Sequence, residues 1–205
     1  MLRPSSPGCV LRAKRRSGFT LIELMVVVAL MGVILALAAP SMREMIDMRR
    51  LRGVNAQLVT DMQFARSEAV TRRTLVRVIF DSTATHTCYT IYTAPTNVMA
   101  SRCDCRAGEG AACPAGSKEL RTVSVPRSSS VTVGVPVGVD PDFAFEPAMG
   151  SLVSIPIDDF SLPVDGLKID TALSTARALR VPLSVSGRPT VCAPPGSTLA
   201  EVACP

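Results

Sequence analysis

A long apolar segment near the amino terminus constrains this chain more than any other feature. Residues 19–39 carry a single charged side chain, Glu23. As an α-helix rising about 1.5 Å per residue, the segment would reach about 31 Å, close to the roughly 30 Å hydrocarbon core of a bilayer. The sequence therefore predicts one membrane-spanning helix over residues 19–39.

The charges that flank this segment favour a cytoplasmic amino terminus. Residues 1–18 contain five basic residues and no acidic one, and such charges are retained on the cytoplasmic side. Arginines at positions 43, 49, 50 and 52 reduce the asymmetry. Because the net charge of +5 lies entirely in residues 1–18, the rest of the chain is formally neutral and its charge does not indicate a nucleic-acid partner.

A secretory signal peptide is the alternative interpretation of this amino terminus. Ala36-Leu37-Ala38 resembles a small-residue cleavage site. The apolar core of a signal peptide is usually only about 7–15 residues long, however, and a carboxylate such as Glu23 is rare near its start. We therefore interpret residues 19–39 as a retained anchor and residues 1–18 as a leader.

Residues 40–74 predict an amphipathic helix that continues the anchor. Their apolar side chains recur every three or four positions, with arginines and acids between them. The result is a nearly continuous helix over residues 21–73, which Pro40 is expected to kink because proline removes a backbone hydrogen bond. The face expected to pack on a sheet consists of Val54, Leu58, Met62, Ala65 and Ala69.

From residue 75 onward the apolar period changes to two and β-branched residues dominate. Residues 75–205 therefore predict a β-rich head, so the fold class is α+β: one long helix packed on an antiparallel sheet. Prolines 136, 156 and 182 indicate edge or interrupted strands. The expected strands are residues 75–80, 87–93, 120–125, 131–137, 151–157 and 179–185.

Six of the seven cysteines follow the leader, since only Cys9 precedes residue 19. An even number of cysteines in an exported head favours disulfides, which we expect to hold two loops, at residues 94–118 and 192–204. Cys192 and Cys204 are a plausible pair, and the other pairings stay open. A zinc site is the alternative for four of them, although Cys103-Asp104-Cys105 is awkward for one tetrahedral ion. The disulfide candidates are Cys88, Cys103, Cys105, Cys113, Cys192 and Cys204.

The run Gly18-Phe19-Thr20-Leu21-Ile22-Glu23 closely resembles the prepilin peptidase recognition sequence of type IV pilins and type II secretion pseudopilins. The resemblance implies cleavage between Gly18 and Phe19, N-methylation of Phe19 and a pilin-like fold. It also implies that Glu23 and Pro40 take part in filament assembly. The expected partners are prepilin peptidase, other pilin-like subunits and the bacterial inner membrane.

A physical argument explains the tolerance of Glu23 inside a membrane segment. A lone carboxylate there costs at least about 2.5–3.5 kcal/mol. Cleavage creates an α-amino group, which is mostly protonated at neutral pH. We expect Glu23 to pair with that amine on a neighbouring subunit, which would fix the register of assembly. The alternative is a glutamate that reaches the headgroups at the membrane surface.

A second resemblance narrows the family to the GspH/FimT branch of minor pseudopilins. It rests on Leu51-Arg52, Leu58, Asp61-Met62-Gln63 and the run from Ala65 to Ala69, then on Phe145-Glu146-Pro147, Gly150, Gly187-Arg188 and Cys192. The implied function is a minor pseudopilin at or near the tip of a type II secretion filament. A minor pilin of a type IV pilus is the close alternative, and a membrane-tethered periplasmic enzyme is a third.

Arg188 is a candidate for DNA binding, because some members of this branch bind DNA through Gly-Arg-x-Arg-x-Cys. Here Thr190 replaces the second arginine, and one arginine supplies little phosphate neutralisation. We therefore favour a β-turn before Cys192 and expect no nucleic-acid partner.

Catalytic and metal chemistry have little support in the sequence. The only histidine, His86, lies in a threonine-rich segment that we interpret as an exposed turn. Asp158, Asp159 and Asp165 lack the ordered spacing of a calcium site. We expect no catalytic residue, metal or cofactor.

Overall fold

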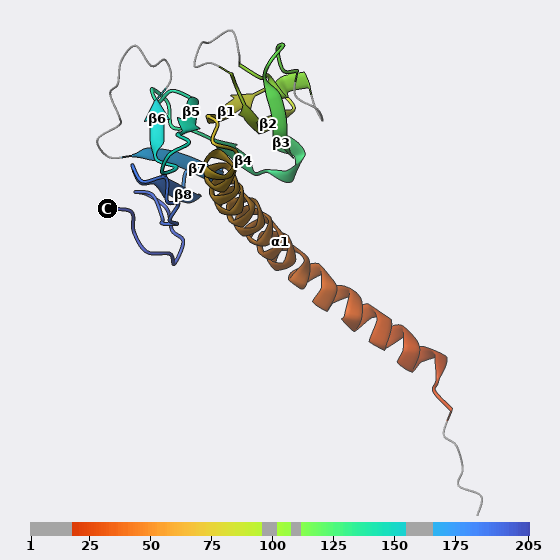
Figure 1. The fold of residues 1–205 in the computed structure, drawn as a ribbon. Coiled ribbons are helices and arrows are strands. Elements are labelled where there is room, and N and C mark those ends of the chain that lie inside the picture. The colour runs from red at the N-terminus through yellow and green to blue at the C-terminus, as the bar shows by residue number, and fades with distance from the viewer. Residues whose placement is uncertain (1–17, 96–101, 108–111, 155–165) are drawn as a thin grey trace, which may run out of the picture. The chain divides into compact units, whose positions relative to one another are not determined.

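The computed structural model describes residues 18–95, 102–107, 112–154 and 166–205 of the 205-residue chain (Figure 1). By its internal contacts the chain divides into two compact units, Met1–Arg43 and Glu44–Pro205. We call the first the anchor unit and the second the head unit, and each is described by itself.

One helix, α1, extends over Leu21–Arg72, within one residue of the predicted bounds. It ends where Arg73 adopts a left-handed conformation with φ of 53°, and the amide of Thr74 then donates to the carbonyl of Ala69 at 3.3 Å. The side chains of residues 38–41 fall outside the described residues. The kink predicted at Pro40 and the predicted role of Pro40 in assembly therefore stay predictions. No single helix of the described chain meets the length and hydropathy expected of a membrane span, whereas Leu21–Leu37 and Met42–Arg72 meet them as a pair.

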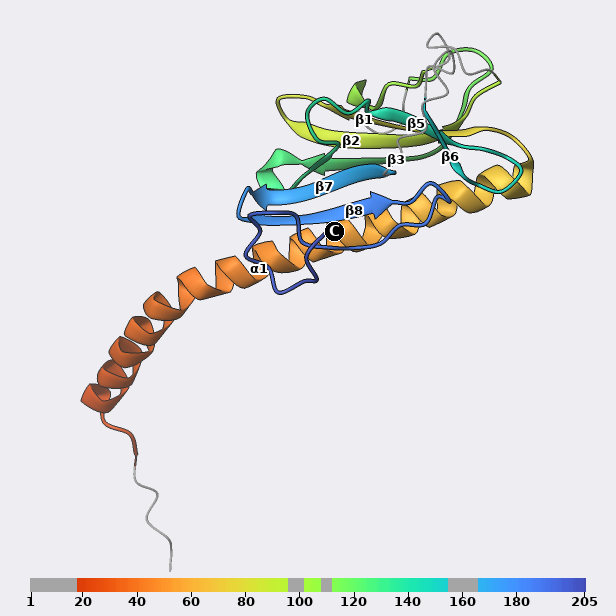
Figure 2. The ribbon, with the colours of Figure 1, turned by 90° about the vertical axis from the view of Figure 1, so that its left-hand side faces the viewer.

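The head unit contains two antiparallel sheets packed on one side of α1 (Figure 2). The larger has the order β3-β2-β1-β5-β6 and the smaller β4-β7-β8. This arrangement confirms the predicted α+β architecture. The strands are β1 Val76–Ser82, β2 His86–Thr93, β3 Lys118–Pro126, β4 Thr132–Gly134, β5 Asp142–Phe145, β6 Leu152–Ser154, β7 Leu167–Ser174 and β8 Arg177–Leu183.

Two strands, β5 and β7, were not predicted. All four residues of β5 are buried, so this short strand lacks the alternation that marks a half-exposed one. In β7 the inward side chains include Thr171, whose polarity interrupts the apolar pattern. Thr171 is buried because it accepts a hydrogen bond from the side chain of Asn55 on α1, at 2.9 Å.

Two predicted strands have different bounds in the structure, and one of them stops before a proline. The strand predicted over residues 131–137 ends at Gly134, two residues before Pro136, which has no amide to donate. The strand predicted over residues 179–185 is β8, which begins at Arg177 and includes Pro182 as an edge residue. For the strand predicted over residues 151–157, only β6 lies within the described chain.

The main core lies between α1 and the sheets, as the helical pattern predicts. Leu58, Met62, Ala65 and Ala69 are fully buried in one cluster with side chains from β1, β2, β5, β7 and β8, and Val54 packs at its margin. Apolar burial stabilises by about 25 cal/mol per Å² removed from water. This stripe therefore fastens residues 44–72 of α1 to the head.

A buried carboxylate adds a polar contact to that apolar interface. Asp61 of α1 is fully buried and accepts a hydrogen bond from the Tyr89 hydroxyl at 2.7 Å. Arg121 of β3 contributes an ion pair, with 2.7 Å between its Nη1 and Asp61 Oδ1. Burial, followed by the bond to Asp61, raises the pKa of the Tyr89 phenol. Tyr89 therefore stays a proton donor, and the network restricts how α1 can slide on the sheet.

All six cysteines of the head form disulfides, which confirms the prediction of cross-links and excludes the zinc alternative. Cys192 pairs with Cys204, as expected. The other pairs are Cys88–Cys105 and Cys103–Cys113. They attach the described part of the 94–118 loop, including the short 3-10 helix η2 over Cys105–Ala107, to the sheet face opposite α1.

Candidate functional site

The peptidase motif places Gly18 and Phe19 directly before the first turn of α1. The Phe19 side chain is 81% exposed. Thr20 caps the helix, because its Oγ1 accepts a hydrogen bond from the Glu23 amide at 3.3 Å. Thr-x-x-Glu is the pattern of a capping box, a signal that the sequence reasoning missed.

Glu23 has a local structural role, separate from the assembly role that the sequence predicts. Its carboxylate lies in the first turn of α1, where negative charge interacts favourably with the helix dipole. Within the described residues that carboxylate has no hydrogen bond or ion pair. Its surroundings are apolar, since the large hydrophobic side chains from Phe19 to Leu37 are all exposed. The anchor unit thus presents one carboxylate on a helix whose apolar surface needs a lipid or protein environment.

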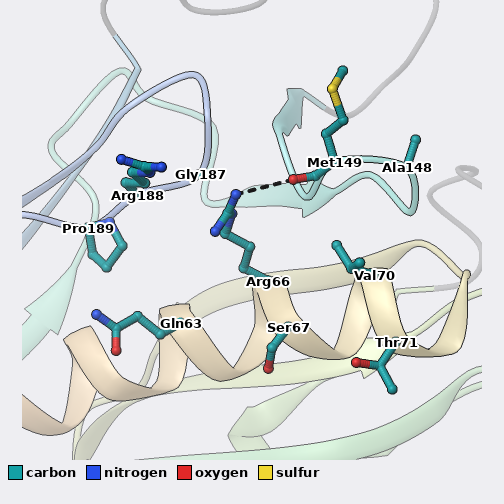
Figure 3. A pocket seen from close by; sticks show the side chains of 10 residues that line it. All are labelled: Gln63, Arg66, Ser67, Val70, Thr71, Ala148, Met149, Gly187, Arg188 and Pro189. Carbon is teal, nitrogen blue, oxygen red and sulfur yellow. Dashed lines mark hydrogen bonds between the residues drawn. The ribbon is translucent and has the colours of Figure 1, made fainter.

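At the far end of α1 the head carries a cleft of about 630 Å³. Figure 3 shows Arg66 rising from the helix into this cleft toward Met149, with Arg188 and Pro189 on the other side. The Arg66 guanidinium donates to the carbonyls of Gly150 and Met149, each at 3.2 Å. The lining is Gln63, Arg66, Ser67, Val70, Thr71, Ala148, Met149, Gly187, Arg188 and Pro189.

Two glycines allow Arg66 to reach its partners. A Cβ on Gly150 would lie 2.7 Å from Cγ of Arg66, and one on Gly187 would lie 2.3 Å from the Gly150 carbonyl oxygen. Both glycines also have positive φ, 68° and 74°, which other residues rarely adopt. Arg66 and Gly150, which are 84 residues apart in the sequence, therefore meet with Gly187 in one packed junction.

Glu146 organises the turn that supplies the accepting carbonyls. Its Oε1 accepts hydrogen bonds from the Met149 amide and the Ser151 hydroxyl, both at 2.9 Å. The bond from the Met149 amide is the main reason that the pKa of Glu146 is lowered. The motif Phe145-Glu146-Pro147 thus positions a turn, which the sequence did not reveal.

Arg188, the candidate for DNA binding, lies at the margin of this cleft. Its amide donates to Ser184 Oγ at 3.2 Å, as in the turn that we predicted before Cys192. Thr190, which stands where a second arginine would be, donates its amide to the Pro182 carbonyl at 3.0 Å. The cleft thus contains two arginines, Arg66 and Arg188. The Arg66 guanidinium already donates to backbone carbonyls.

The remaining candidates lie elsewhere. His86 is the first residue of β2 and half-buried, with its Nδ1 at 3.1 and 3.0 Å from the hydroxyls of Thr83 and Thr85. Its prediction as an exposed turn residue was wrong because these threonines fold against it. Asp158, Asp159 and Asp165 lie outside the described residues. Among the described residues no group of His, Cys, Asp or Glu is arranged to hold a metal ion.

Two sequence families match the chain. Residues 13–39 match the prokaryotic N-terminal methylation motif, and residues 55–187 match the type II transport protein GspH. No curated protein gives a significant match. Among solved structures the chain is similar to the type IV minor pilin FimU of Pseudomonas aeruginosa PAO1. One crystal form is 18% identical over 70% of this chain and 88% of that one, with a TM-score of 0.45. A second is 17% identical over 68% and 90%, with a TM-score of 0.43.

One family match lies within the anchor unit and the other within the head unit. The methylation motif ends at residue 39, within the anchor unit, and the second match begins at residue 55 of α1 and ends at Gly187 in the cleft. The second match therefore spans the helix stripe, both sheets and the Arg66 junction. Since it covers well over half of the sequence, this chain belongs to the GspH family of pilin-like subunits.

Proposed function

We propose that this chain is a minor pseudopilin of a type II secretion system, a structural subunit at or near the tip of a short filament that helps to initiate its assembly. The observation that carries the proposal is the presence of both family matches in one chain: a methylation motif at residues 13–39 and a GspH head over residues 55–187. The motif implies processing by prepilin peptidase and assembly into filaments.

The maturation step follows from the amino-terminal residues. Prepilin peptidase cuts between Gly18 and Phe19, and the new amine of Phe19 is methylated. The exposed apolar side chains from Phe19 to Leu37 support insertion in the inner membrane. The basic leader favours a cytoplasmic amino terminus, so the head is periplasmic.

Glu23 then sets the axial register between neighbouring subunits during assembly. Its unpaired carboxylate is unfavourable in lipid, and a protonated amine on the neighbouring subunit relieves that penalty only at the correct axial position. Pro40, at the end of the apolar segment, contributes to the same packing. The capping bond from the Glu23 amide to Thr20 keeps the first turn helical without using the carboxylate.

A structural role needs no catalytic group, and we assign none. The GspH family consists of pilin-like subunits. The contacts of Arg66, Glu146 and Arg188 described above are with backbone and neighbouring side chains, as expected for residues with a structural role.

The test is a deletion of the encoding gene, complemented with the wild-type chain or with Glu23→Ala. We expect the deletion to reduce secretion of exoproteins without affecting twitching motility, and the wild-type chain to restore secretion. Glu23→Ala should insert and be cleaved but fail to join the filament or restore secretion. Loss of twitching with normal secretion would instead identify a minor pilin of a type IV pilus. Full restoration by Glu23→Ala would contradict the register role.

A further inference from the structure

The disulfides that cover the outer face of the larger sheet are interleaved in sequence. Cys88 pairs with Cys105, while Cys103, which lies between them, pairs with Cys113. Neither pair joins cysteines that are neighbours among the cysteines of the chain. The third disulfide, Cys192–Cys204, joins consecutive cysteines and serves as an internal comparison.

Local backbone pairing holds the Cys103–Cys113 disulfide. Asp104 and Ala112 exchange two backbone hydrogen bonds of 3.0 Å each, so they form an antiparallel bridge. Cys103 and Cys113 are the next opposed pair, with Cα atoms 4.2 Å apart. That is near the roughly 4.5 Å of a non-hydrogen-bonded pair, in which facing side chains are closest. The native pairing is therefore favoured once this bridge has formed.

Contacts with the sheet hold the other disulfide. Cys88 lies on the β2 face that also carries Thr90 and Tyr92, opposite Asp81 of β1. Arg106, next to Cys105, pairs with Asp104 at 2.8 Å and reaches Asp81 at 3.5 Å. Cys88 and Cys105 are both fully buried. The seating of η2 against β1 and β2 therefore holds these two cysteines together in the folded head.

An unfolded chain would not select these partners. The consecutive pairings, Cys88–Cys103 and Cys105–Cys113, close loops each two residues shorter than the native spans of 17 and 10 residues. Loop-closure entropy grows only slowly with length, so it favours the non-native pairs at least as much as the native ones. Export from the anchored amino terminus also brings Cys88 and Cys103 out before Cys105.

We propose that this chain is a substrate of a periplasmic thiol–disulfide isomerase, which converts consecutive pairs in the 88–113 region into the interleaved native pairs. The proposal relies on the export of the head, which is part of the proposed function. It adds a partner class, a dithiol enzyme that recognises an incompletely folded outer face.

The chemistry balances without net oxidation. A disulfide oxidase first accepts two electrons and two protons for each bond that it forms. The isomerase thiolate then attacks a mispaired bond such as Cys88–Cys103, forming a mixed disulfide and releasing one chain thiolate. Exchange among the chain sulfurs yields Cys88–Cys105 and Cys103–Cys113, and the last chain thiolate displaces the isomerase as the thiolate that began the cycle. Once buried, the native bonds are protected from further attack.

The experiment expresses the full chain in two bacterial strains that both contain the disulfide oxidase, one with and one without the isomerase. Free thiols are blocked, the protein is extracted in detergent, and the disulfides are mapped by mass spectrometry. Proteolysis before Asp104 separates Cys103 from Cys105, so native and consecutive pairings give different peptides. Without the isomerase we expect at least a several-fold loss of native pairing and an accumulation of Cys88–Cys103.

Two matched double variants test whether interleaving is the cause. Cys103→Ala with Cys113→Ala leaves only consecutive pairs and should lose the dependence on the isomerase. Cys192→Ala with Cys204→Ala keeps the interleaved pairs and should retain it. Equal native pairing of the wild-type chain in both strains would overturn the proposal, as would dependence of the first variant on the isomerase.

A cell-free experiment tests this proposal independently of the proposed function. The reduced, denatured full chain in detergent is oxidised with purified oxidase, and isomerase is then added or omitted. Conversion of consecutive into native pairs only when isomerase is present supports the proposal whatever the filament does. Native pairing with oxidase alone contradicts it, even if the chain proves to be a pseudopilin.

Discussion

The two faces of the larger sheet are stabilised in different ways. The inner face packs on α1 through a large apolar cluster with no disulfide. Among the described residues the outer face has a small apolar cluster of Ile79, Tyr92, Ala94 and Cys103, and it carries two disulfides and a buried ion pair. A thin layer with little apolar area needs cross-links to stay folded, whereas a thick one does not. The faces should therefore respond differently to mutation and to reductant.

The largest effect is expected from breaking the buried ion pair of the outer face. Arg77 and Asp142 are 0% and 1% exposed, and Arg77 Nη2 lies 2.5 Å from Asp142 Oδ2. Burial raises the pKa of the Asp142 carboxyl, and Arg77 opposes that shift. Asp142→Ala removes the carboxylate that pairs with the buried Arg77 charge and should lower the free energy of unfolding by about 3–5 kcal/mol, measured by urea denaturation.

The matched control for this ion pair removes both charges. Arg77→Met combined with Asp142→Leu should recover most of the loss, because an apolar pair of similar volume avoids the desolvation penalty. A double variant as unstable as Asp142→Ala would show that the outer face needs the charges themselves.

On the inner face, Leu58→Ala should lower the free energy of unfolding by about 2–5 kcal/mol, because it opens a cavity in the main core. Gln57→Ala, one position earlier on the exposed side of α1, should change it by less than about 0.5 kcal/mol. For each variant, the change in the free energy of unfolding relative to the wild-type chain should be the same with and without a reductant. A reductant-dependent difference would mean that the two faces are coupled.

The disulfides of the outer face should contribute somewhat less than the ion pair. Cys88→Ala with Cys105→Ala removes a cross-link that spans 17 residues and should cost about 2–4 kcal/mol. Limited proteolysis should then cut first at Arg102 or Arg106, while the inner face stays protected. Cutting within α1 at the same rate would contradict the separation of the two faces.

The smallest effect is expected at the turn beside the cleft. The pKa of Glu146 is lowered below its ordinary value of 4.5, so its stabilisation is fully present above about pH 4.5 and is lost as the pH falls through the lower folded pKa. Glu146→Gln should remove about 1 kcal/mol at neutral pH and flatten that part of the stability profile. An unchanged profile in thermal unfolding from pH 3 to 7 would exclude this role.

How much the sequence could predict depends on whether a feature is set by local pattern or by contacts between distant segments. The helix bounds and its inward stripe were readable because Leu58, Met62, Ala65 and Ala69 follow one helical face. The sequence also indicated the peptidase motif, the disulfides and the β-rich head. Thr171 hid β7, because its burial depends on Asn55, which lies 116 residues away.

The pairing of the four outer-face cysteines and the Arg66 junction were not predictable for a related reason. The partner of Cys105 is set by how η2 seats on β2, and that contact has no local signal in the sequence. Likewise, the sequence showed Gly150 and Gly187 only as residues of a family motif, and nothing local in it indicates that the Arg66 side chain packs against both. Both features depend on tertiary contacts between distant segments.

The central claim is that the chain is processed into a filament subunit that keeps its anchor. It is tested most directly by intact-mass and N-terminal peptide analysis of the protein purified from membranes. The account predicts a chain that begins at N-methylated Phe19, and a Gly18→Ala variant that keeps all of residues 1–18. A mature chain that begins at Ala39 or Pro40, released from the membrane, would contradict it.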